Sequence, residues 1–450
     1  MKKIVRMALY SASVLAVLSS CSEDDFVQMP SPKAEIENAL GTNELMQGKS
    51  TWFKAINKSS ESDLKYTWTV NGKEVATADS FLFSMPEAGK YIVGLKSEKD
   101  QRESVTYTEM HVYGKFRDGT FILNEGNMSN ETGLLIFVDR EGVATDSAYY
   151  RANGSFLGNV AQDLFIHNGK MYIISQNGPM NGGEGILTVA NAETLKKEGI
   201  YLNGYAAAKQ LNWPSHIAVL SERELYIRDN NGLSLYDPAA DKLTKISDTK
   251  GASKNRMVVA DKKVFAPAGK NILVLKDGKV IEKLEMSGTV SGIIKNKAGN
   301  LYVSCTSNPA QILEIKPSDY SIVKSNELPA SFRIGAGWGA SPGITAKGDT
   351  IYFNNGSTTI NRHIFGANET LEMFTVGDYV TNGKMAYNNM GVDPVSGDIY
   401  TPTIKGYGMD YLINNIPVFN YDDKGKIVLV HDYENMNRFP SGVYFTENFK

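Results

Sequence analysis

Arginine, lysine and aromatic residues stand just before or between several apolar segments of this 450-residue sequence, and these residue types suit the binding of an aromatic anion. Arginine gives planar, multi-donor contacts and stacks on rings, while tryptophan and tyrosine give large rigid contact areas. The residues selected for such a ligand site are Arg151, Trp213, His216, Lys254, Arg256, Arg333, Trp338, Arg362, Lys405, Tyr407 and Arg438. Taken singly, each is better explained as a solvated charge or a packed side chain, so the prediction rests on the group.

The residue sets that enzymes use are largely missing. The sequence has no His-x-x-x-His or His-Glu-x-x-His motif and only two cysteines, so a zinc hydrolase or a cysteine-based metal site is not expected. Ser341 lies in Gly339-Ala-Ser-Pro-Gly343, but a nucleophile elbow requires a strand-to-helix turn, which this β-rich region does not offer. Paired carboxylates for glycoside cleavage stay open, because their separation is a three-dimensional quantity. We expect a binding protein rather than an enzyme, with no metal or cofactor of its own.

The first residues have the pattern of a targeting signal. Three basic residues precede an apolar run over residues 7–18, which is too short to span a bilayer. The run ends in Leu18-Ser-Ser-Cys21, which resembles a bacterial lipobox, and Ser22-Glu-Asp-Asp25 resembles the surface-export signal of Bacteroidota lipoproteins. We therefore expect a signal peptide over residues 1–20, lipidation of Cys21, an acidic tether over 21–33 and exposure on the outer face of the outer membrane. The alternatives are an ordinary secretory signal with a chance cysteine, and a solvated charged tether.

Charge and cysteine content narrow the partners further. The formal net charge is -3, and a broad nucleic-acid-binding surface needs a strong basic excess, so a nucleic-acid partner is not expected. If Cys21 carries lipid, Cys305 has no disulfide partner in this chain. Its apolar surroundings predict a buried thiol in the core.

Residues 34–115 alternate large apolar and polar residues over several short segments. Tyr66-Thr-Trp-Thr-Val70 places its large residues on one face, and Asn71-Gly72 is a strong hairpin turn. Segments of this length and number predict a small β-sandwich. The pattern Tyr-x-Trp-x-x-Asn-Gly, followed by Gly-x-Tyr-x-Val, resembles a PKD-like immunoglobulin domain, and we expect it to act as a spacer.

Residues 119–450 contain a repeated unit, a polar turn followed by an aromatic residue in an apolar strand. The aromatic residues are Tyr172, Tyr226, Phe265, Tyr302, Tyr352 and Tyr400, spaced 37 to 54 residues apart. A repeat of about 40–50 residues with strands throughout indicates a β-propeller with about four strands per blade. The copies account for six blades, and residues 120–139 with the terminal residues 439–445 would make a seventh. We therefore predict an all-β protein, a seven-bladed propeller preceded by the sandwich, with six or eight blades as the alternatives.

A family resemblance follows from three segments of the repeat region. Phe121-Ile-Leu-Asn-Glu-Gly-Asn127, Leu157-Gly-Asn-Val-Ala-Gln-Asp163 and His167-Asn-Gly-Lys-Met-Tyr-Ile173 resemble the DUF5074/YncE-like surface propellers of Bacteroidota. The resemblance implies a surface lipoprotein that works beside a TonB-dependent outer-membrane transporter. The sandwich-plus-propeller layout is similar to the branch that captures ferric catecholate siderophores such as enterobactin, with iron arriving inside the ligand. The alternatives are cobalamin capture, as in a sister branch, and a glycan-binding or adhesion propeller.

Overall fold

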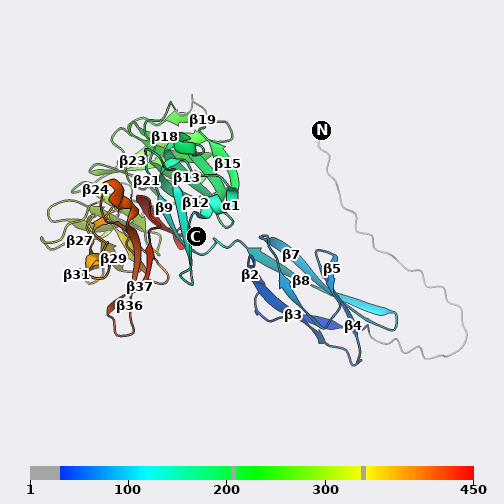
Figure 1. Ribbon diagram of the computed structural model, residues 1–450. Helices are drawn as coiled ribbons and strands as arrows, with labels where there is room; N and C mark the ends of the chain where they lie inside the picture. Colours follow the sequence, from blue (N-terminus) through cyan, green and yellow to red (C-terminus); the bar gives the residue numbers. More distant parts are fainter. Residues whose placement is uncertain (1–30, 204–208, 336–340, 389) are drawn as a thin grey trace, which may run out of the picture. The chain divides into compact units, whose positions relative to one another are not determined.

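The computed structural model describes residues 31–203, 209–335, 341–388 and 390–450 (Figure 1). The chain divides into two compact units, the first ending at Val112 and the second beginning at Tyr113. No helix in the described ranges is long and apolar enough to cross a membrane. The expected signal peptide and Cys21 lie outside the described residues.

The first unit packs two antiparallel sheets around an aromatic core. One sheet has the order β1 (Ala34–Asn38), β3 (Ser50–Asn57), β6 (Ser80–Ser84); the other has the order β2 (Glu44–Met46), β8 (Arg102–Tyr113), β7 (Gly89–Lys99), β4 (Lys65–Val70), β5 (Lys73–Ala76). Phe53 and Phe83 from the first sheet share a buried cluster with Trp68 from the second. Asn71 and Gly72 both have positive φ in the β4–β5 turn, as a type I′ hairpin requires. The alternating pattern therefore forms a small sandwich.

The second unit consists of seven sheets, six of four strands and one of six strand segments, in the part of the chain that the structure describes. The innermost strands of most neighbouring sheets contact one another. These inner strands are β12 (Asn159–His167), β16 (His216–Ser221), β20 (Val258–Ala260), β24 (Val290–Lys295), β28 (Thr345–Lys347), β33 (Gly391–Val392) and β38 (Pro440–Phe445). The second strands are β9 (Gly119–Asn124), β13 (Lys170–Gly178), β17 (Glu224–Asp229), β21 (Lys263–Ala268), β25 (Leu301–Cys305), β29 (Thr350–Phe353) and β34 (Ile399–Tyr400).

Each sheet is completed by a third and an outer strand. The third strands are β10 (Leu134–Asp139), β14 (Leu187–Asn191), β18 (Gly232–Asp237), β22 (Asn271–Lys276), β26 (Gln311–Ile315), β30 (Thr359–Ile364) and β36 (Asn414–Tyr421). The outer strands are β11 (Ala144–Thr145), β15 (Lys197–Tyr201), β19 (Lys242–Lys245), β23 (Lys279–Glu285), β27 (Ile322–Glu327), β31 (Glu369–Thr375) and β37 (Ile427–Glu434). The last blade also holds β32 (Met385–Ala386) and β35 (Thr403–Ile404), which pair with each other. The unit is a seven-bladed β-propeller, as the repeat predicted.

The repeated aromatic residue fills the space between neighbouring blades. Tyr172 on β13 shares a buried cluster with Ile217 of the next blade, and Tyr302 on β25 shares one with Ile351 of its next blade. This packing explains why one aromatic residue recurs in the second strand of each blade from β13 to β34. Cys305 on β25 is fully buried, which confirms the predicted core thiol, and burial raises its pKa to about 11.

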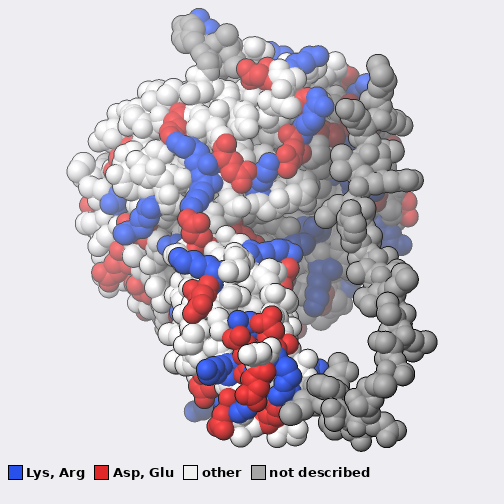
Figure 2. All heavy atoms as spheres, turned by 90° about the vertical axis from the view of Figure 1, so that its right-hand side faces the viewer, with Lys and Arg blue, Asp and Glu red and all other residues white. Residues whose placement is uncertain are grey.

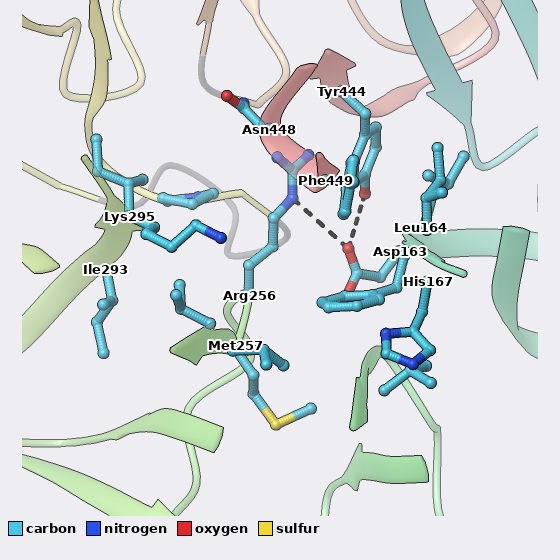
Figure 3. A pocket seen from close by; sticks show the side chains of 17 residues that line it. Asp163, Leu164, His167, Arg256, Met257, Ile293, Lys295, Tyr444, Asn448 and Phe449 are labelled. Carbon is cyan, nitrogen blue, oxygen red and sulfur yellow. Dashed lines mark hydrogen bonds and ion pairs between the residues drawn. The ribbon is translucent and has the colours of Figure 1, made fainter. Parts of the chain in front are cut away.

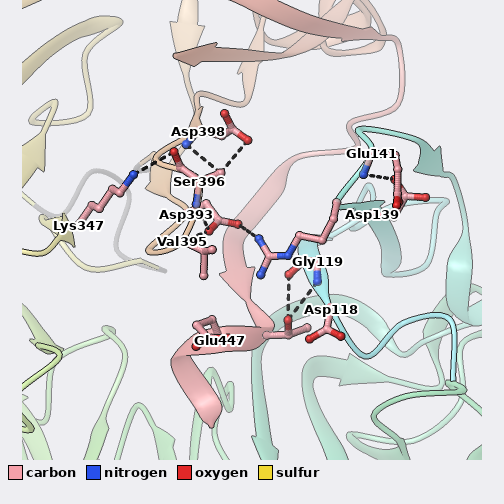
Figure 4. Close-up of polar contacts among 12 residues, drawn as sticks. Asp118, Gly119, Asp139, Glu141, Lys347, Asp393, Val395, Ser396, Asp398 and Glu447 are labelled. Carbon is pink, nitrogen blue, oxygen red and sulfur yellow. Dashed lines mark hydrogen bonds and ion pairs between the residues drawn. The ribbon is translucent and has the colours of Figure 1, made fainter. Parts of the chain in front are cut away.

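The two ends of the propeller sequence meet in one blade. The last strand, β38, pairs antiparallel with β9, placing Tyr444 opposite Phe121. Beside the same seam, Arg140 donates to Asp393 of the preceding blade at 2.5 Å, and the Gly119 amide donates to the Thr446 hydroxyl at 3.1 Å (Figure 4). Closure in this way removes the free sheet edges that a linear array would expose.

Antiparallel blades place two kinds of connection at opposite ends of the ring. Segments that lead into an inner strand, and segments that join second to third strands, share what we call the long-loop end. Turns that join first to second strands, such as Asn168-Gly169, and turns that join third to outer strands share the turn end. The residues selected from the sequence as a ligand site were predicted to lie in loops at the long-loop end.

Candidate functional site

The exposed aromatic residues of the propeller lie at its long-loop end. Among the described residues of this unit, the exposed aromatic side chains are those of Tyr150, Phe156, Trp213, Tyr379 and Tyr407. All five stand in connections that enter inner strands or join second to third strands. The exposed methionines of the same unit, Met128, Met180 and Met409, stand there too. Exposed aliphatic residues such as Ile281 and Ile322 lie instead on outer strands.

Part of this surface runs across the closing seam, through Glu131, the 405–413 loop, Arg438 and Phe439, and we call this part the arc. Tyr411 stacks on Phe439 with ring centroids 4.6 Å apart and donates its hydroxyl to Glu131 at 3.0 Å. Arg438 approaches the same carboxylate, with Nε 3.7 Å from Oε1. These contacts join the 405–413 loop of the last blade to both connections of the closing blade.

A pocket of about 370 Å³ opens within the arc. Its polar lining includes Glu131, Asn181 and Arg438, and its aromatic lining includes Tyr150 and Phe156. The two rings stack with centroids 4.5 Å apart, next to the short helix α1 (Ala148–Asn153). A site with aromatic walls, amide groups and one paired guanidinium can bind a ligand that has both ring surface and hydrogen-bonding groups.

A carboxylate and an amine face each other where the central channel meets the long-loop end. Glu125 accepts hydrogen bonds from Gln162 Nε2 at 2.7 Å and from the Tyr387 hydroxyl at 3.2 Å. Burial raises the pKa of Glu125, and the positive charge of Lys254 opposes that rise. Burial likewise lowers the pKa of Lys254, against the attraction of Glu125. This opposing pair gives the channel mouth polarity without a large net charge.

Comparison with known proteins agrees with this architecture. A model of DUF5074, a domain of unknown function, matches residues 118–446. The chain belongs to the DUF5074 family. A quinoprotein alcohol dehydrogenase-like protein from Bacteroides thetaiotaomicron has a similar structure, with a TM-score of 0.52 and 17% identity over 90% of this chain and 96% of that one. A second protein from that organism, of unknown function, has a TM-score of 0.38 and 12% identity over 90% and 88% of the two chains. No curated protein matches the sequence.

The DUF5074 propeller places several of the selected residues in connections at its long-loop end. Arg438 and Lys405 lie near the closing seam, where Lys405 pairs with Asp410 at 3.0 Å. Tyr407 and Trp213 are exposed, at 49% and 54%. Arg151 lies on α1 and donates to the backbone oxygen of Asp146.

Two other selected residues lie outside the arc, and one is not described. Lys254 stands at the channel mouth beside Glu125. Arg333 is exposed in the connection between β27 and β28 and donates to the carbonyls of Ala330 and Phe332. Trp338 lies outside the described residues.

Three selected residues are not on the loop surface where they were predicted. Arg362 lies inside strand β30, where its guanidinium bonds to the Tyr421 hydroxyl of the next blade at 2.8 Å. His216 is the first residue of β16 and is fully buried beside Ser215. Arg256 points into the central channel and pairs with Asp163. Inner-strand starts and polar strand residues resemble loop residues in sequence, which explains these errors.

Charges at the long-loop end are mostly compensated. Arg438 is matched by Glu131, Lys405 by Asp410, and Lys254 by Glu125. On the side of the molecule that Figure 2 shows, basic and acidic side chains are also interspersed. In the part of the chain that the structure describes, no cluster of three or more His, Cys, Asp or Glu residues is arranged to hold a metal ion. Contact area and hydrogen bonding, rather than a strong positive field, are therefore what this surface offers.

Sequence reasoning missed residues that only the fold brings together. Glu131 and Asn181 were not selected, because nothing in their local sequence marks them as lining one pocket with Arg438, which is more than 250 residues away in the chain. Phe156 and Met409 had a detectable signal, since each is a large apolar residue in a glycine-containing loop. Such residues are unexpectedly apolar for loops and suggest contact with a partner.

Proposed function

We propose that this DUF5074 protein is a lipid-anchored cell-surface protein whose long-loop end captures a ring-containing small molecule. The observation that carries the proposal is the gathering of the exposed aromatic side chains of the propeller, among the described residues, at that end. Aromatic rings contribute large contact areas with little conformational freedom to lose, so they are frequent anchors in binding sites. The lipobox-like segment ending at Cys21 supports the anchoring part of the proposal.

The ligand that we place first is a ferric catecholate siderophore such as enterobactin. Its exposed catechol rings would stack on residues such as Trp213 and Tyr407, and its negative charge would meet the guanidinium of Arg438. The protein would then pass the complex to a TonB-dependent outer-membrane transporter. The resemblance of the sandwich-plus-propeller layout to siderophore-capturing lipoproteins supports this ligand class.

Cobalamin is the second candidate, and one observation favours it. Arg438 and Lys405 on the arc have carboxylate partners, so these two cations attract an anion less strongly than the sequence suggested. Cobalamin is large and not strongly anionic, and it would use the same contact area without needing unpaired cations. The two ligands therefore make different demands on the same surface.

The experiment is a calorimetric titration of the purified protein with ferric enterobactin and, separately, with cyanocobalamin. Trp213→Ala and Tyr407→Ala should each weaken binding of the true ligand by roughly threefold to tenfold, the range expected for one aromatic contact. Tyr107→Ala is the matched control, because Tyr107 is 65% exposed but lies on β8 of the first unit. Equal affinity in Trp213→Ala, Tyr407→Ala and the control would contradict the location of the site, and no binding of either ligand would favour a glycan or protein partner.

A further inference from the structure

A second pocket, of about 260 Å³, lies inside the central channel. Its walls come from inner strands β12, β16, β20 and β24, from the closing strand β38, and from the 3-10 helix η4 (Thr446–Phe449). His167 and Lys295, the last residues of β12 and β24, line it together with Asn448 and Phe449. The pocket therefore opens toward the turn end, opposite the loops of the proposed capture site.

An arginine with unsatisfied hydrogen-bond donors lines this pocket together with Lys295. Arg256 stacks on Tyr444 at 3.7 Å from the ring centroid, donates Nη1 to the Val443 carbonyl at 3.1 Å, and places Nε 3.6 Å from Asp163 Oδ1 (Figure 3). Its Nε and Nη2 atoms are buried and have no hydrogen-bond acceptor among the described residues. Buried donors are nearly always satisfied, because an unmade bond costs the full desolvation of the group. Because Nε is directed at Asp163, Nη2 is the atom left for an acceptor supplied by a bound molecule.

The charge of the pocket is unbalanced by one. Among the described residues that line it, Asp163 is the only acid, and it pairs with Arg256. Lys295 is exposed and has no ion-pair partner in the described part of the chain, and Figure 3 shows its amine directed toward Arg256. A carboxylate between the Lys295 amine and the Arg256 guanidinium would balance the charge and supply the missing acceptor.

Most of the remaining lining is apolar. Val219, Met257, Val259, Ile293 and Phe449 line the pocket beside the two cations. A cavity of about 150 Å³ holds a benzene ring, so this larger pocket has room for a ring or short chain together with a carboxylate. We infer that the channel pocket binds a small monocarboxylate with an apolar body, held by Lys295 and Arg256 at one end and by the apolar walls at the other.

The test is calorimetric titration of the purified protein with octanoate and with 3-phenylpropionate, which share the carboxylate but differ in the apolar body. We expect saturable one-to-one binding of at least one of them, and the probe that binds more tightly identifies a chain or a ring as the preferred body. Acetate, which lacks the apolar body, and 1-octanol, which lacks the charge, should both bind far more weakly.

Two variants and a control locate the binding in the channel. Lys295→Ala should weaken octanoate binding by about tenfold, the loss expected for one charge-assisted contact. Val259→Phe should fill the pocket and block binding, whereas Lys297→Ala, an exposed lysine outside the lining, should bind as the unaltered protein does. Lack of saturable binding at millimolar concentrations, or equal affinity in Lys295→Ala, would overturn the inference. The capture site is tested with other ligands and variants, so either result leaves it unaffected.

Discussion

Two ion pairs in this protein have the same chemistry in different surroundings. At the long-loop end, Lys405 and Asp410 pair at 3.0 Å with side chains 39% and 52% exposed. In the channel, Arg256 and Asp163 pair at 3.6 Å with side chains 20% and 3% exposed. Water screens the first pair and leaves it weak, whereas the second holds together residues from separate blades in a low-dielectric setting. The long-loop end is therefore free to vary its residues for binding, while the channel is tied to the fold.

The largest expected effect is the difference between removing the acid of each pair. Asp163→Ala leaves the Arg256 charge unpaired in the channel and removes the acceptor of the Ile217 amide and the Tyr444 hydroxyl. The loss in the free energy of unfolding should be about 3–5 kcal/mol. Asp410→Ala should change it by about 0–1 kcal/mol, because the pair is exposed. Urea unfolding of both variants measures the two values, and similar losses would show that burial does not separate the pairs.

Titratable groups in the channel and at the blade interfaces change the stability of the fold in opposite directions as pH falls. Burial raises the pKa of Asp163 to about 6 despite the opposing charge of Arg256. The folded state then binds a proton that the unfolded state has lost, so this group removes on the order of 3 kcal/mol of stability as pH rises from about 4 to 6. Burial also raises the pKa of Glu125, with the same sign.

A buried histidine acts in the opposite direction over the same range. His363 lies between Asn326 and Thr370, and burial lowers its pKa to about 4. The unfolded state binds the proton first, so His363 removes stability as pH falls from about 6.5 to 4. Asp163→Asn should therefore expose a steeper loss of stability on acidification than the unaltered protein has. Urea unfolding at several pH values measures the slope, and an unchanged slope would mean that Asp163 titrates normally.

Replacing a glycine by alanine should also cost more stability in the channel than at the long-loop end, but the difference is smaller. A Cβ atom on Gly442 would lie 1.9 Å from Nη2 of Arg256, so Gly442→Ala must displace the guanidinium from Tyr444. Overpacking of this kind costs about 1–3 kcal/mol. At Gly406 in the long-loop end, the nearest atom to a new Cβ is 3.5 Å away, which is ordinary contact. Gly406→Ala should thus leave the melting temperature nearly unchanged, and an equal decrease in both variants would argue against the packing of Arg256.

The same contrast explains what could be predicted from sequence. The repeated aromatic residues and the turns before them are local signals, so six blades followed from them, and the leftover segments 120–139 and 439–445 suggested the seventh, closing blade. Asp163, Arg256 and Tyr444 lie far apart in the chain and meet only when the ring closes, so no local pattern identifies them as partners. Arg362 was misplaced because β30 reads Thr-Ile-Asn-Arg-His-Ile, where three consecutive polar residues separate two isoleucines directly after a Gly-Ser-Thr loop. Polar residues in a strand that packs on the next blade look like loop residues.

The smallest effect concerns the charge of the capture site. Glu131 neutralises Arg438 on the arc, and both side chains are about one-third exposed, at 29% and 31%. Glu131→Gln keeps an oxygen for the Tyr411 hydroxyl but removes the negative charge, so an anionic ligand should bind about threefold more tightly, as expected for an exposed pair. The gain should shrink as salt rises, because exposed charges are screened. An uncharged ligand should show no gain in Glu131→Gln, and neither ligand should respond to Glu369→Gln on the outer strand β31. A gain for ferric enterobactin alone would mean that the charge of the ligand contributes to binding at the arc. Equal affinity for ferric enterobactin in Glu131→Gln and Glu369→Gln would leave contact area as the basis of recognition and favour cobalamin.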